Sequence, residues 1–142
     1  MRPALLLGLV GLALVGFGAV SAAVGLWFSA WLLAQLPPVA IDASAVGGAA
    51  FALGVSAAML GAVHILMALL LARAGNRVAV AGVVLTASMA VLAVAWASAA
   101  LVSAASGSAP VAQMLPAGIG LLVLAAAYAW ATADLVTLRR RS

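Results

Sequence analysis

Residues 11–25 read GLALVGFGAVSAAVG, and this stretch decides the fold class because it is continuously apolar and carries glycine at every seventh position. The chain repeats the combination at 47–61, which read GGAAFALGVSAAMLG. Neither stretch contains a charge, and neither alternates polar with apolar residues as a barrel strand does. Backbone polar groups in lipid must find partners within their own segment, so both stretches predict membrane-spanning α-helices.

The whole chain has the composition of an integral membrane protein. Of its 142 residues, 69% are apolar and 6% are charged, and the mean hydropathy is +1.38. A soluble globular domain carries roughly a quarter of its residues as charges. The high apolar content excludes intrinsic disorder, and the absence of cysteine excludes a disulfide framework or a cysteine-ligated metal site.

Charged residues divide the chain into three uncharged runs, 3–41, 43–72 and 78–133. One crossing needs about 20 apolar residues, so the last run is long enough for two helices. Its break is predicted at 103–110 (SAASGSAP), where small polar residues, glycine and proline permit a tight turn. We therefore expect an all-α four-transmembrane-helix bundle with short loops, and residues 1–142 as a single membrane domain. The expected helices are about 4–33, 45–73, 78–103 and 111–138.

The first expected helix has a competing interpretation as a signal peptide, because Arg2 precedes an apolar stretch. The apolar run continues through Trp27 and Trp31, beyond the ~7 to 15 residues of a signal-peptide core. It ends only at Pro37 and Pro38, which remove backbone donors. A retained transmembrane helix is the better interpretation.

The positions of the charges predict the orientation. With four crossings, all six arginines fall on one side, which the positive-inside rule makes the cytoplasm. We expect a multi-pass protein of the bacterial inner membrane with both termini in the cytoplasm, and Asp42 in the first external loop. Asp134 lies near the end of the last helix, where it could pair with an arginine. The expected cytoplasmic-interface charges are Arg73, Arg77, Asp134 and Arg139.

Two glycine series predict how the first two helices pack. They are Gly11, Gly18 and Gly25 in the first helix, and Gly47, Gly54 and Gly61 in the second. Lipid tails are as apolar as leucine, so transmembrane helices associate where small residues allow close contact. Seven residues fall 20° short of two turns, so each series forms a slowly drifting stripe. We expect the two stripes to face each other, with comparable ridges at Gly82, Thr86, Ala90, Ala93 and Ala97 and at Gly118, Ala125, Ala129 and Ala133.

His64 is the titratable side chain most clearly placed at membrane depth. It lies nine residues before Arg73, about 13 Å from the cytoplasmic surface. The same depth on the other two helices predicts a polar layer of His64 with Thr86 or Ser88, and Tyr128. One hypothesis is functional: His64 is an axial ligand of haem or chlorin, a proton relay, or a contact for a quinone or metabolite. The other is structural: neutral His64 makes one interhelical hydrogen bond, worth about 0.6 kcal/mol.

The sequence contains no nucleophile with a base and an orienting group, no carboxylate pair and no metal cluster. We therefore expect no enzyme and no metal site. The leading expectation is a structural or accessory subunit of a larger membrane complex or a homo-oligomer. Its partners would be the lipid bilayer and other membrane subunits or copies of itself, without nucleic acid. The alternative is a membrane binding or transport component that uses the His64 layer.

Overall fold

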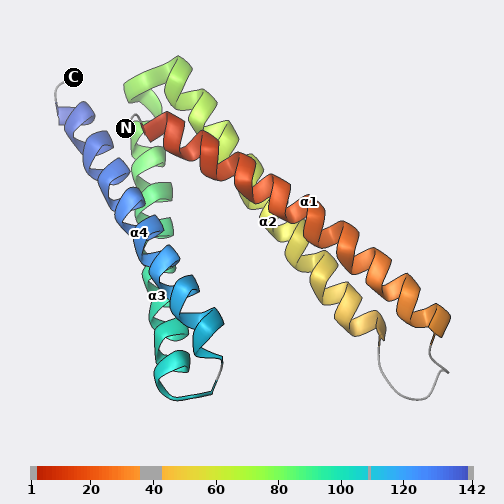
Figure 1. Cartoon of the computed structure of the whole chain (residues 1–142). Helices are drawn as coiled ribbons and strands as arrows, with labels where there is room; N and C mark the ends of the chain where they lie inside the picture. The colour runs from red at the N-terminus through yellow and green to blue at the C-terminus, as the bar shows by residue number, and fades with distance from the viewer. Residues whose placement is uncertain (1–2, 36–42, 109, 141–142) are drawn as a thin grey trace. The chain divides into compact units, whose positions relative to one another are not determined.

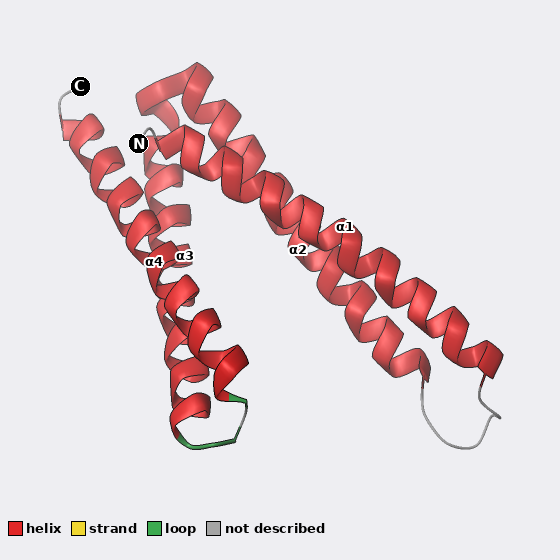
Figure 2. Ribbon diagram, viewed as in Figure 1, coloured by secondary structure: helices red, strands yellow, loops and turns green. Residues whose placement is uncertain are grey.

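The computed structural model describes residues 3–35, 43–108 and 110–140, which are helical apart from one turn. The elements are α1 (Pro3–Gln35), α2 (Ala43–Ala74), the short 3-10 helix η1 (Gly75–Val78), α3 (Ala79–Ala105) and α4 (Val111–Arg140) (Figure 1). No strand occurs among these described residues (Figure 2). Each of the four α-helices is long and apolar enough to cross a membrane, as the sequence predicts.

The helices form two compact units, each a hairpin. One unit comprises residues 7–69, with most of α1 and α2, and the other comprises residues 1–6 and 70–142, with α3 and α4. Each unit has its own packing, and the two are considered separately below. The expectation of a single membrane domain stays a prediction.

In the α1–α2 hairpin, the backbones of the two glycine stripes touch. A Cβ atom added at Gly54 would lie 2.6 Å from the carbonyl oxygen of Gly18 and 2.6 Å from the backbone nitrogen of Ala22. One added at Gly61 would lie 2.6 Å from the carbonyl oxygen of Gly11. Real side chains do not approach backbone atoms this closely, so only glycine fits. The facing pairs are Gly11 with Gly61, Gly18 with Gly54, and Gly25 with Gly47.

The α3–α4 hairpin packs differently, because its glycines receive side chains. A Cβ atom at Gly82 would lie 3.1 Å from Cδ1 of Leu135, and one at Gly118 would lie 2.8 Å from Cγ of Leu101. A leucine side chain can move away from an added Cβ atom, whereas a helix backbone cannot. The buried residues are Ala79, Gly82, Thr86, Ala93, Ala97 and Ala104 in α3, and Gly118, Ala125, Tyr128, Ala131 and Leu135 in α4.

The expected ridge on α4 is wrong in its second half, since Ala129 and Ala133 are exposed. Each step of four residues advances 40° around a helix beyond a full turn. Two such steps after Ala125 carry Ala133 60° away from the direction of Gly118. The buried face instead continues through Tyr128 and Leu135.

The turn between α3 and α4 follows the small polar stretch that the sequence marks. Gly107 has φ +69°, a left-handed conformation that glycine adopts without strain. Its N–H donates to the carbonyl of Ala104, and the N–H of Ser106 donates to the carbonyl of Val102, which satisfies the end of α3. The Pro110 carbonyl accepts from the N–H groups of Gln113 and Met114 and so begins α4.

We expect Gly54→Ala to destabilise the α1–α2 hairpin, because its Cβ would meet two backbone atoms at 2.6 Å. Overpacking of this kind costs typically 1 to 3 kcal/mol. Gly16→Ala is the matched control, since a Cβ there has no atom within 4 Å. It should be neutral or stabilising by up to about 1 kcal/mol through helix propensity. SDS titration in mixed micelles measures both, and equal effects of the two substitutions would refute the backbone contact.

Candidate functional site

A hydrogen bond between two threonines joins α3 to α4 in the apolar interior of the hairpin. The Thr132 hydroxyl donates to Oγ1 of Thr86 at 2.7 Å, and the Thr86 hydroxyl donates to the carbonyl oxygen of Gly82 at 2.9 Å. Oγ1 of Thr132 also lies 2.8 Å from the carbonyl oxygen of Tyr128, which its single hydrogen can reach instead. Thr86 is completely buried. The polar groups at this point are therefore satisfied within the hairpin.

Thr132 is the residue of this contact that the sequence analysis missed. It lies 14 residues after Gly118, so two heptads place it about 40° from that glycine. Extending the α4 ridge by sevens rather than fours would have found it. The bond explains why a hydroxyl is retained at position 86, since an unpaired polar group in hydrocarbon is costly.

The other expected members of the polar layer on this hairpin differ in burial. Tyr128 is completely buried, one turn before Thr132 on the same face of α4. Ser88 is exposed, because two residues turn it 200° from Thr86. Of the two candidates on α3, Thr86 therefore lies on the buried face and Ser88 does not.

His64 belongs to the α1–α2 hairpin and is also completely buried. Its Nδ1 lies 2.8 Å from the carbonyl oxygen of Leu60, one turn earlier in α2. A carbonyl only accepts, so Nδ1 carries the hydrogen. This bond fixes the ring against its own helix. The shared layer of His64 with Thr86 and Tyr128 spans the two units and stays a prediction.

The expected interface charges lie near helix ends. Arg73 and Arg77 are exposed, on the last turn of α2 and on η1. Arg139 is exposed on the last turn of α4, where Asp134 is half-buried. The Thr137 hydroxyl donates to the backbone carbonyl of Asp134 at 2.8 Å. Pairing of the Asp134 carboxylate with an arginine stays a prediction, and Arg2, Asp42 and Arg141 lie outside the described residues.

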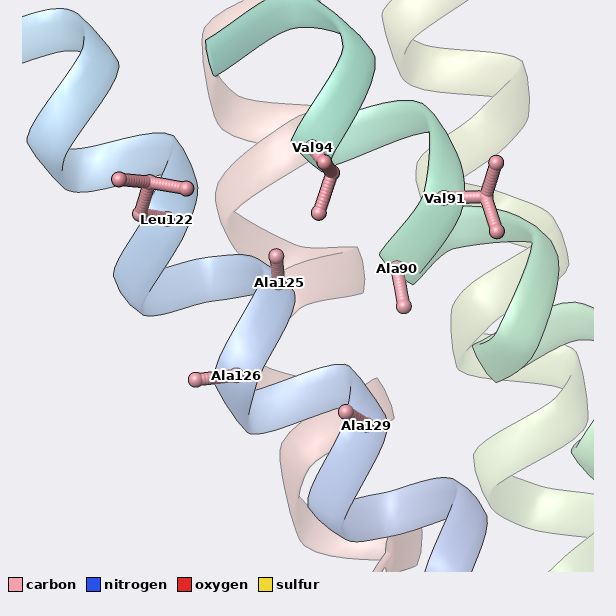
Figure 3. Close-up of a pocket in the computed structure, with 7 residues that line it drawn as sticks. All are labelled: Ala90, Val91, Val94, Leu122, Ala125, Ala126 and Ala129. Atoms are coloured by element: carbon pink, nitrogen blue, oxygen red, sulfur yellow. The ribbon is translucent and has the colours of Figure 1, made fainter. Parts of the chain in front are cut away.

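One groove of the α3–α4 hairpin is lined by apolar side chains alone. A groove of about 460 Å³ is lined by Ala90, Val91 and Val94 of α3 and by Leu122, Ala125, Ala126 and Ala129 of α4 (Figure 3). Every one of these side chains is apolar. Within the described ranges, no group of three histidine or acidic residues could hold a metal ion. The lining of this groove therefore suits an apolar ligand or an apolar side chain.

Comparison with models of protein families, with curated proteins and with solved structures found no match for this chain. The residues themselves therefore provide the basis for inferring function. The relevant features are a histidine hydrogen-bonded to its own helix, a hydrogen-bonded threonine pair, helix faces of small residues and charged helix ends.

We expect Thr132→Val to destabilise the α3–α4 hairpin by about 0.6 kcal/mol, the average for interhelical hydrogen bonds in a membrane protein, and at most by about 1.7 kcal/mol. In a double-mutant cycle with Thr86→Val, the coupling energy should match that value. Ser98→Ala is the control, because the exposed Ser98 hydroxyl donates to the carbonyl of Val94 in its own helix. A coupling energy of zero from unfolding titrations would contradict the interhelical bond.

Proposed function

We propose that this chain is a structural or accessory subunit of a larger membrane complex, or a homo-oligomer, and not an enzyme. The observation that carries the proposal is a set of outward glycines. Gly16, Gly48 and Gly120 lie within helices, and a Cβ atom at each would have no atom within 4 Å. Glycine in a helix interior costs about 1 kcal/mol relative to alanine. Contacts within each hairpin do not explain that cost, whereas a helix of another subunit packed against these positions would.

The scarcity of buried polar groups supports the same proposal. Among the described residues, the completely buried side chains with a polar group are His64, Thr86 and Tyr128, and the first two each bond a carbonyl of their own helix. A transport path or a catalytic site needs several polar groups that face one space. A scaffold needs only packed helices with apolar exteriors. Large apolar side chains such as Leu12, Leu53 and Val123 are indeed exposed.

For the setting, we propose a four-helix bundle in the bacterial inner membrane, with both termini in the cytoplasm. The support is the distribution of arginine in the sequence, since all six fall on one side after four crossings. The proposed partners are lipid and other membrane subunits or further copies, without nucleic acid.

Native mass spectrometry of the full chain, extracted in a mild detergent, tests the proposal. We expect either a homo-oligomer, with a mass of two or more times 13.9 kDa, or a stoichiometric complex with a second membrane chain. Gly16→Leu or Gly120→Leu should reduce the assembled fraction, because a side chain would fill the open position. Val24→Leu and Val123→Leu, at exposed positions of the same helices, are controls that should leave it unchanged. A chain that stays monomeric without a companion would refute the proposal.

The second candidate function is a binding or transport component that uses His64. The bond from Nδ1 to the Leu60 carbonyl favours it, since iron-ligating histidines commonly donate one ring N–H to a carbonyl and bind metal through the other nitrogen. The complete burial of His64 by protein atoms supports the structural role instead, because a haem or chlorin needs open space beside the ring.

An absorption spectrum of the purified protein separates these two functions. Under the scaffold proposal, we expect no Soret or chlorin band in the natural protein, with helical content kept in His64→Gln. A Soret band that disappears in both His64→Ala and His64→Gln would establish the second function, provided circular dichroism shows that both variants fold.

A further inference from the structure

A second groove on the α3–α4 hairpin combines an apolar floor with two positive charges. It has a volume of about 330 Å³ and lies between the start of α3 and the end of α4. Val80, Val83 and Val84 of α3 and Val136 of α4 form the apolar part. Arg139 and Arg140 line it from the last turn of α4. All six residues belong to one unit, so the groove depends on this hairpin alone.

The groove is placed at the depth where hydrocarbon meets lipid headgroups. α3 begins at Ala79, directly before Val80, and α4 ends at Arg140, so both helix ends border the groove. The valines extend one turn further into each helix. Arginine side chains at the end of a spanning helix reach toward the headgroups while their methylene stems stay on apolar surface. Charge and apolar floor therefore meet at the level of a phospholipid phosphate.

The local charge favours an anion. None of the six lining residues is acidic. Asp134, the nearest acidic residue in the α4 sequence, lies five residues before Arg139 and is not part of the groove lining. Guanidinium groups donate in a fork that matches the oxygens of a phosphate. Basic pockets between helices at a membrane interface are known binding places for anionic lipid headgroups.

We propose that this groove binds one anionic phospholipid. The phosphodiester lies between Arg139 and Arg140, and one acyl chain follows the valine floor between α3 and α4. Neither charge nor floor is sufficient alone. The charges select an anionic headgroup over a zwitterionic one, and the floor selects a lipid over free phosphate. The inference does not depend on the proposed subunit role.

The test is native mass spectrometry of the full chain in dodecyl maltoside, titrated with phosphatidylglycerol. We expect the natural protein to retain one phosphatidylglycerol in preference to phosphatidylcholine. Arg139→Gln/Arg140→Gln should weaken that affinity about 30-fold, from roughly 1 kcal/mol for each arginine. The matched control is Arg73→Gln/Arg77→Gln, which removes the same charge at exposed positions outside the groove. It should change the affinity less than about threefold. Circular dichroism checks that both variants keep their helices.

A second pair of variants tests the floor without changing charge. Val84→Trp fills the groove from a position that is 61% exposed, and Val102→Trp makes the same change at a 65% exposed position elsewhere on α3. We expect only Val84→Trp to weaken binding, and we expect glycerol phosphate to leave phosphatidylglycerol in place. Equal losses in the two arginine double variants would show diffuse charge attraction and overturn the site. Displacement by glycerol phosphate, or equal effects of the two tryptophans, would overturn the lipid assignment.

Discussion

All four helices are long and apolar enough to span a membrane, and helices in lipid gain nothing by burying apolar side chains against one another. Helices there hold together only by contacts closer than lipid can make, or by hydrogen bonds that lipid cannot supply. The α1–α2 hairpin uses the first means, with close backbone contact at three glycine pairs spaced seven residues apart. The α3–α4 hairpin adds the second, through the Thr132–Thr86 bond. One chain thus contains both solutions to the same physical problem.

The two solutions respond differently to substitution. At Gly54 the obstacle to a side chain is the backbone of α1, which is fixed by its own helical hydrogen bonds. At Gly82 the obstacle is the end of the Leu135 side chain, which can rotate. Register in the first hairpin is therefore specified at every glycine pair. In the second hairpin, the threonine bond adds a directional contact between the two helices.

The sequence predicts those features that come from a repeated residue pattern or from residues that interrupt an apolar run. Glycine every seventh residue predicts the α1–α2 contact face, and the stretch 103–110 predicts the turn at Gly107. Charge positions predict the four helices. The detail of the α4 face was beyond this reasoning, because alanine is too common in that helix to show which of its faces is buried. The sequence pattern favours Ala129 and Ala133 for the contact over Thr132, which lies about 60° from Ala129 and 100° from Ala133 around the helix.

Among the described residues few polar side chains are buried, so the features that packing within each hairpin does not explain lie mostly on the outer helix faces. Glycine residues at two positions illustrate this point. Gly54 is explained by the α1 backbone that it meets, whereas the packing of the α1–α2 hairpin gives no reason for glycine at position 16. A glycine that its own hairpin does not require leaves a face on which a further helix can pack as closely as α1 packs on α2.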